Sequence, residues 1–131
     1  MKKRGILNHE LSAVIARLGH TDLLVIADAG LPIPPGVPRL DLAISAGVPA
    51  FLQVLRPVLE EVAVESVIIA SELREASPAF YQALQSALGG LPVRELPHAD
   101  FKQMTQRARA VVRTGEFTPY ANVILVAGVA F

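Results

Sequence analysis

The chain has 131 residues, a length that fits a single domain, and its 12 basic residues balance its 12 acidic ones. A formal net charge of zero gives no electrostatic footprint for phosphate backbones or anionic lipid, so we expect neither nucleic acid nor a membrane as a partner. The absence of cysteine excludes disulfides, thiolate nucleophiles and cysteine-ligated metals. Hydrophobic residues make up 52% of the chain, and we interpret this apolar surplus as surface for subunit contacts.

Neither terminus predicts export or membrane insertion. The basic start, residues 1–4, resembles the beginning of a signal peptide, but polar side chains interrupt the following apolar run already at Asn8. The longest apolar run, residues 123–131, is too short to span a bilayer as a helix. We therefore expect a cytoplasmic protein.

The first predicted element is a helix that begins near Asn8. Apolar side chains recur at helical spacing from Leu11 to Leu18, and Gly19 provides the stop. His20 therefore follows directly after the C-terminal end of this helix, where the partial negative charge of the backbone favours a protonated imidazole.

A buried strand is predicted at residues 23–27, with His20 before it and Asp28 after it. Ligand sites in open α/β sheets tend to lie at the carboxyl ends of strands. A histidine can give and take a proton near neutral pH, while a carboxylate can orient it or hold a hydroxylated ligand. The two side chains converge only if the turn at Gly19 folds back. Residues 28–38 follow as a stiff loop that is rich in proline.

The rest of the chain alternates strands and helices. The predicted elements are a short strand at 39–44, a helix from Pro49 to about Val62 with a break or kink near Pro57, a strand at 65–70, a helix at 78–88 closed by Gly89 and Gly90, a strand at 91–96, a helix at 98–108, and strands at 110–113 and 123–129. This alternation predicts an α/β fold: a single domain over residues 1–131, with alternating helices and strands around a mainly parallel central sheet.

The common nucleotide and metal motifs are missing from the sequence. The chain contains no glycine-rich dinucleotide or triphosphate fingerprint, no zinc-protease motif and no EF-hand loop. Its three histidines lie far apart and show no metal-ligand spacing. We therefore expect no bound metal.

Three polar residues are candidates for chemistry, and each also has a purely structural interpretation. His20 can act as an acid, or it can bind the last carbonyls of the preceding helix. Asp28 can anchor a ligand, or it can form a turn before Gly30. His98 can contact a ligand, or it can simply begin a helix. The residues alone leave these alternatives open.

A polar loop at residues 114–122 lies between two strongly apolar strands, and loops on a rigid scaffold often carry function. Tyr120 and Asn122 bracket Ala121 at the entry to the last strand, where alternation places both side chains on one face. That arrangement suits hydrogen bonds to a hydroxylated ligand, although the tyrosine can instead pack over the sheet and the asparagine can bond its own backbone. Glu116 remains a candidate because of its loop. Glutamates elsewhere are interpreted as solvated: Glu60, Glu61, Glu72 and Glu75.

Taken together, these segments resemble the family of ribose pyranases and fucose mutarotases. The resemblance runs along essentially the whole chain and is carried by residues 1–8, 18–22, 28–32 and 115–122. Fucose mutarotases typically carry an Asn-Phe-Pro type sequence after the aspartate, whereas this chain has Gly-Leu-Pro at residues 30–32. That difference favours the ribose branch of the family.

The resemblance implies a role for each candidate residue. His20 would be the proton donor, and the substrate-binding residues would be Asp28, His98, Tyr120, Ala121 and Asn122. It also implies a cytoplasmic homo-oligomer of the decameric, stacked-ring type, with sites near subunit boundaries and no cofactor.

The implied activity is the interconversion of the pyranose and furanose forms of D-ribose, which supplies ribose for phosphorylation. Ring opening requires a proton at the ring oxygen and loss of a proton from the anomeric hydroxyl, and a positioned acid or base accelerates such a step about 10²- to 10⁴-fold. The residues do not identify the base. Two alternatives stay open: a fucose-type mutarotase, and a non-catalytic sugar-binding module associated with ribose transport.

Overall fold

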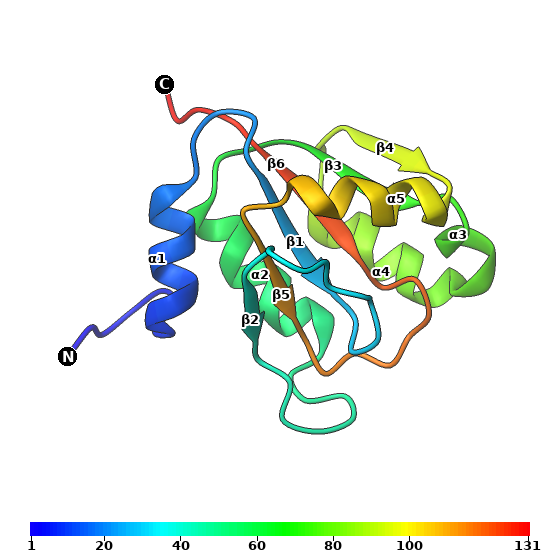
Figure 1. Ribbon diagram of the computed structural model, residues 1–131, viewed down its shortest axis with the longest axis horizontal. Helices are drawn as coiled ribbons and strands as arrows, with labels where there is room; N and C mark the ends of the chain where they lie inside the picture. Colours follow the sequence, from blue (N-terminus) through cyan, green and yellow to red (C-terminus); the bar gives the residue numbers. More distant parts are fainter.

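A six-stranded sheet forms the centre of the computed structural model, which describes residues 1–131 (Figure 1). Its strand order is β2-β5-β1-β6-β3-β4. The strands are β1 (Leu23–Ala27), β2 (Arg39–Asp41), β3 (Val64–Ala70), β4 (Val93–Leu96), β5 (Ala110–Arg113) and β6 (Val123–Ala127). Strand β6 runs antiparallel to both of its neighbours, β1 and β3, and the other pairings are parallel. The predicted α/β fold with a mainly parallel sheet is confirmed.

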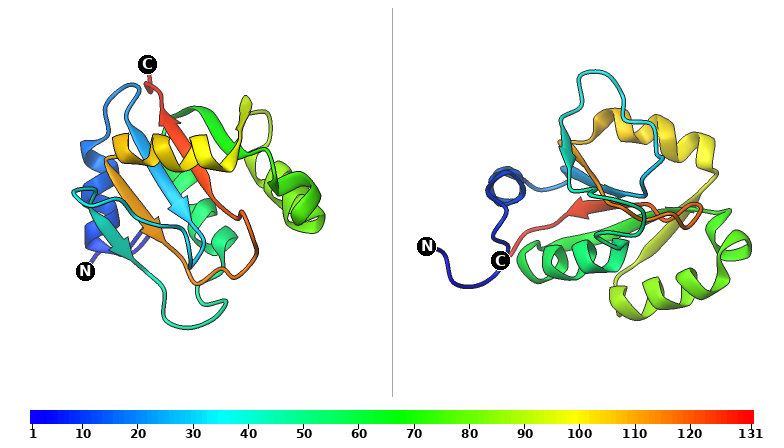
Figure 2. Two further views of the ribbon diagram at one scale, coloured as in Figure 1. Left: turned by 45° about the vertical axis from the view of Figure 1, so that its right-hand side comes forward. Right: turned by 90° about the horizontal axis from the view of Figure 1, so that it is seen from below.

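Helices cover both faces of this sheet (Figure 2). They are α1 (His9–Arg17), α2 (Phe51–Glu61), α3 (Leu73–Ala76), α4 (Pro78–Leu88) and α5 (His98–Met104), followed by a 3₁₀ turn, η1 (Thr105–Arg107). Alternating residues of β1 face opposite layers: Leu24 and Ile26 belong to the core under α2 and α4, while Val25 packs with Phe101 of α5. Because β1 is buried on both faces, it reads as an unbroken apolar run rather than as an alternating one.

The ends of several predicted elements differ from the structure for local reasons. Strand β2 stops at Asp41, whose carboxylate accepts a hydrogen bond from the Ala43 N–H (3.0 Å) and turns the chain. Helix α2 continues through Pro57 without the predicted break, because its buried face offsets the lost backbone hydrogen bond. Helix α5 tightens into η1 at Thr105, whose hydroxyl donates to the Lys102 carbonyl (2.6 Å).

The direction of the strands gives the sheet two distinct ends. Five strands run the same way, so their carboxyl ends meet, and the antiparallel β6 begins at that same place. We call this the carboxyl end of the sheet and the opposite one the amino end. Asp28 follows β1, His98 follows β4 and Asn122 precedes β6, so all three lie at the carboxyl end. His20 precedes β1 and lies at the amino end.

None of the helices combines the length and the apolar character that crossing a bilayer demands. Helix α1 begins where the sequence predicts, and Asn8 caps it: the Asn8 side chain accepts a hydrogen bond from the Leu11 N–H (2.8 Å).

Candidate functional site

Asp28 and Asn122 form a pair of reciprocal hydrogen bonds at the carboxyl end of the sheet. The Asn122 side-chain N–H donates to the Asp28 carboxylate (3.0 Å), and the Asp28 backbone N–H donates to the Asn122 side-chain oxygen (2.8 Å). Asn122 is only 1% exposed, so these bonds fix its amide orientation. The other carboxylate oxygen of Asp28 accepts the Gly30 N–H (2.9 Å), as expected for a turn. Asp28 therefore serves both the turn and the pair.

His98 lies beside this pair, at the start of α5. Its ring stands edge-on to Tyr120, with ring centroids 5.0 Å apart. Its Nδ1 atom is buried and has no hydrogen-bond partner within the chain. Buried polar atoms are rarely left unpaired, and such exceptions are frequent at functional sites. We call Asp28, His98, Tyr120 and Asn122 the carboxyl-end cluster.

Glu72 supports His98 from the loop between β3 and α3. Both of its carboxylate oxygens lie 3.0 Å from the His98 backbone N–H, which donates to them. Glu72 is therefore not part of a solvated helix face, as the sequence suggested, but a partly exposed loop residue that binds the start of α5. Desolvation raises the pKa of Glu72, but hydrogen bonds from the His98 N–H and the Ser71 hydroxyl outweigh it and leave the pKa below its ordinary value. No periodicity in the sequence joins residues this far apart.

The imidazole of His98 favours its neutral form. Burial is the largest cause that lowers the pKa of His98 below its ordinary value of 6.5, and the Lys102 charge acts in the same direction. The carboxylates of Glu72 and Asp28 oppose this shift without cancelling it. A neutral ring can both accept and donate a hydrogen bond, which suits a sugar hydroxyl.

This lowered pKa predicts a loss of stability in mild acid. The unfolded chain protonates this histidine at a higher pH than the folded protein does, so the free energy of unfolding falls as the pH drops below about 6.5. We expect the change H98N to remove this part of the pH dependence. Urea unfolding at about pH 7.5 and about pH 5.5 measures it. Equal losses in wild type and variant contradict the assignment to His98.

Tyr120 lies next to His98 because of a turn, and not because of the side-chain alternation of a strand. Its φ of 61° places it in the left-handed region, inside a turn rather than in an extended strand. The Asn122 N–H closes this turn on the Tyr120 carbonyl (2.8 Å), and the preceding Pro119 carbonyl accepts the buried Ser77 hydroxyl (3.0 Å). Ala121 is fully buried between them. The turn therefore directs Tyr120 and Asn122 to the same cluster.

A depression of about 390 Å³ opens beside Asp28. Its lining comes from the loop after β1 and the loop before β6: Asp28, Ala29, Gly30, Arg113, Glu116, Phe117, Thr118 and Pro119. Glu116 is engaged structurally, because its carboxylate accepts the Phe51 N–H at the start of α2 (2.9 Å) and the Thr118 hydroxyl (2.8 Å). Polar groups on these two loops thus line an open depression, which shares Asp28 with the carboxyl-end cluster.

His20 does not join this cluster within one chain. Strand β1 separates it from Asp28, and five strand residues span roughly 17 Å. The Asp22 carboxylate accepts the Gly19 N–H (2.8 Å), which holds the His20 turn, and it pairs with Arg109 (2.9 Å). The Gly19 hydrogen bond and then Arg109 lower the pKa of Asp22. The turn at Gly19 does not bring His20 back to Asp28.

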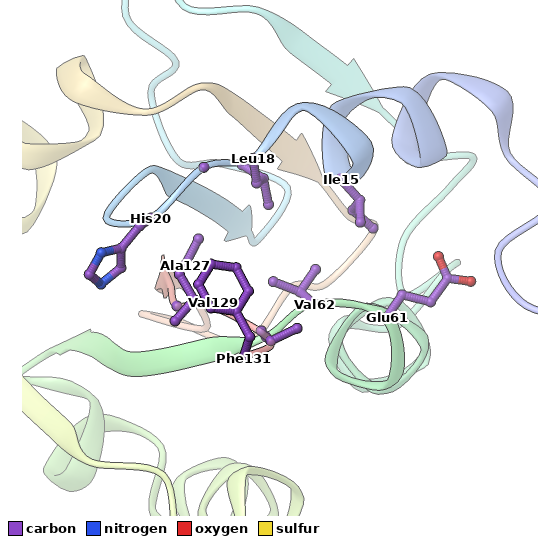
Figure 3. A pocket seen from close by; sticks show the side chains of 12 residues that line it. Ile15, Leu18, His20, Glu61, Val62, Ala127, Val129 and Phe131 are labelled. Carbon is purple, nitrogen blue, oxygen red and sulfur yellow. The ribbon is translucent and has the colours of Figure 1, made fainter.

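An apolar pocket of about 510 Å³ adjoins His20 at the amino end of the sheet. Figure 3 shows His20 at one side of this pocket and Glu61 at the other, with Val129 and Phe131 between them. Val129 and Phe131 are both exposed. No group of three or more histidine or acidic side chains is arranged to hold a metal ion, here or elsewhere in residues 1–131.

Comparison with known proteins identifies the family to which this architecture belongs. The model of the RbsD / FucU transport protein family matches residues 1–130. The chain belongs to the RbsD / FucU family. The D-ribose pyranase of Laribacter hongkongensis is 57% identical to it over 131 residues, which cover both chains in full. That of Geobacillus kaustophilus is 51% identical over the whole chain and 96% of the relative. The family resemblance in the sequence is confirmed.

Solved structures of the RbsD / FucU family have the same fold. The structure of Bacillus subtilis RbsD complexed with D-ribose is 50% identical, covers 100% of both chains and superimposes with a TM-score of 0.96. The fucose mutarotase of Streptococcus pneumoniae in complex with L-fucose is 22% identical, covers 95% of both chains and has a TM-score of 0.73. At that identity the likeness to the fucose enzyme concerns the fold alone.

Proposed function

We propose that this protein interconverts the pyranose and furanose forms of D-ribose and so supplies ribose for phosphorylation. One observation carries the proposal: the carboxyl-end cluster offers preorganised hydroxyl partners in a chain 50% identical, over its full length, to the RbsD that is complexed with D-ribose. Asp28, His98, Tyr120, Ala121 and Asn122 bind the sugar, through side chains or the main chain, and His20 is the acid. A cytoplasmic location belongs to the same proposal.

The chemistry is a reversible proton transfer at the two oxygens of the hemiacetal. A proton leaves the anomeric hydroxyl, the carbon–oxygen double bond of the aldehyde forms, and the bond from C1 to the ring oxygen breaks. The ring oxygen receives a proton. Closure through the C4 hydroxyl in place of the C5 hydroxyl then gives the furanose, with the opposite proton transfers. Each step conserves atoms, and a positioned acid or base supplies the acceleration.

His20 and the sugar-binding residues meet between two copies of the chain in this proposal. Strand β1 keeps them apart within one copy, so a site containing both requires His20 from a neighbour. Exposed apolar side chains near both ends of the sheet and around the N-terminal segment support association: Leu7, Ile44, Val48, Phe117, Val129. We propose a homo-oligomer, a decamer of stacked rings, whose sites lie at subunit boundaries.

Two-dimensional exchange NMR on equilibrated ribose tests the activity. We expect cross-peaks between the pyranose and furanose signals to grow on addition of catalytic amounts of protein. Acceleration with fucose but not ribose would assign the fucose activity instead. Saturable ribose binding without faster exchange would leave a non-catalytic sugar-binding module.

A mixing experiment tests the shared site. Alone, H20A is expected to lose exchange and N122A to bind ribose at least about tenfold more weakly, so at ribose concentrations well below saturation both variants should be far less active than the wild type. Unfolding them together and refolding the mixture produces hetero-oligomers in which the intact His20 of one copy faces the intact Asn122 of another. We expect exchange activity to reappear, up to about a quarter of the wild-type rate for random pairing of equal amounts. No recovery in hetero-oligomers detected by native mass spectrometry contradicts a site built from two chains.

A further inference from the structure

His20 has a close partner within its own chain, Glu65, which has no role in the proton transfers proposed above. The Nε2 atom of His20 lies 2.7 Å from the Oε2 atom of Glu65, at the start of β3. Both side chains are about half exposed, at 55% and 51%. An exposed contact between a histidine and a carboxylate contributes little to folding stability, so stability alone does not explain why the two side chains lie this close.

A β-bulge places Glu65 beside His20. In the pairing of β3 with β6, Val64 lies opposite Ala127 and Ser66 lies opposite Val126, so Glu65 is the extra residue between them. Bulges of this type turn a side chain away from the regular alternation and recur next to active sites. The strand therefore departs from its ladder at the residue that contacts His20.

The backbone around this contact is tightly fitted. A Cβ atom at Gly128 would lie 3.3 Å from the Glu65 Cβ, so glycine leaves the room that the bulge occupies. On the other side, Thr21 has a φ of 70°, which is unfavourable for a β-branched residue, and its N–H donates to the Ala127 carbonyl (2.8 Å). Local strain next to His20 is thus held by β6, the strand that pairs with β3 across the bulge.

We propose that Glu65 is a positioning residue for His20, an inference that rests on the proposed function. Its carboxylate accepts a hydrogen bond from the Nε2–H group, and this bond holds the neutral imidazole in the tautomer that carries its proton on Nε2. Nδ1 is then unprotonated and directed to the sugar. Nδ1 then takes the proton of the anomeric hydroxyl as the bond from C1 to the ring oxygen breaks, and it returns this proton to the ring oxygen. The imidazole ends in its starting state, so one atom of His20 serves as both base and acid.

Replacement of Glu65 tests this role through the tautomer and through the kinetics. In sugar-free protein labelled with ¹⁵N, the chemical shifts of the two ring nitrogens of neutral His20 report which one carries the proton. We expect the Nε2–H form in wild type, a mixture in E65A and a largely retained Nε2–H form in E65Q, whose amide oxygen can still accept the bond. The variant E60A removes another exposed carboxylate and serves as the matched control.

The exchange kinetics should follow the tautomer. We expect E65A to lower the exchange rate at saturating ribose about tenfold, which is less than the whole acceleration that a positioned acid or base provides. The ribose concentration that gives half of the maximal rate should stay unchanged. E65Q should recover most of the rate. E65A with an unchanged tautomer and an unchanged rate overturns the role of Glu65 while the activity stands. A wild-type protein that fails to accelerate exchange rejects the proposed function instead, and the tautomer measurement still decides whether Glu65 holds the ring.

Discussion

Replacing His20 with alanine is expected to reduce the ribose exchange rate about 10²- to 10⁴-fold, the contribution of a positioned acid or base. The fold should not change, because His20 is exposed and the only hydrogen bond of its side chain is the one with Glu65. Saturation-transfer or two-dimensional exchange NMR on ribose measures the rate. Circular dichroism and light scattering check that the variant folds and assembles like the wild type.

Measuring how H20A binds ribose distinguishes a loss of proton transfer from a loss of sugar recognition. Because we propose that the carboxyl-end cluster makes most of the contacts with the sugar, H20A should still bind ribose in calorimetry, with an affinity near that of the wild type. A variant that keeps wild-type exchange removes His20 from the acid role. A variant that loses binding as well as exchange assigns His20 to sugar recognition rather than to proton transfer.

Replacing Asn122 with alanine is expected to affect both stability and ligand binding. The change removes both bonds that join Asn122 to Asp28, and it leaves the Asp28 N–H without its partner in a partly buried place. We expect a loss of about 2 kcal/mol in the free energy of unfolding, the usual cost of an unsatisfied polar group. Ribose affinity should fall at least about tenfold, because the carboxylate is no longer held in place.

A capping variant provides the matched control for N122A. The change N8A also removes a hydrogen bond from an asparagine side chain, here the one that caps α1, and should cost about 1 kcal/mol. It lies away from the carboxyl-end cluster, so ribose affinity should not change. Urea unfolding and calorimetry on the two variants distinguish a general loss of stability from a loss specific to the site. Equal ribose affinity in both variants contradicts a role for Asn122.

The sequence could predict the elements because apolar runs and turn residues mark them locally. It indicated the stop after α1, the buried β1 and the polar loop before β6 from spacing alone. It could not predict the direction of β6, because a strand buried on both faces has the same pattern whichever way it runs. Nor could it separate His20 from Asp28, since their distance depends on β1 lying straight between them.

The residues that support the site were missed for a related physical reason. Glu65 reads as the polar start of a strand, and only its register against β6 shows the bulge that turns it toward His20. Glu72 reads as a helical surface residue, and only the fold brings it to the His98 N–H. Their roles arise from contacts between distant segments, whereas composition and periodicity describe near neighbours.

The position of β6 has a consequence for the order of folding. This strand follows the other five in the chain, yet it lies between β1 and β3 and joins the group β2-β5-β1 to the pair β3-β4. Until β6 is added, the two groups share no backbone hydrogen bonds across the middle of the sheet. During synthesis, therefore, the two halves emerge before the strand that joins them, and their apolar edges stay open to wrong pairing until it arrives.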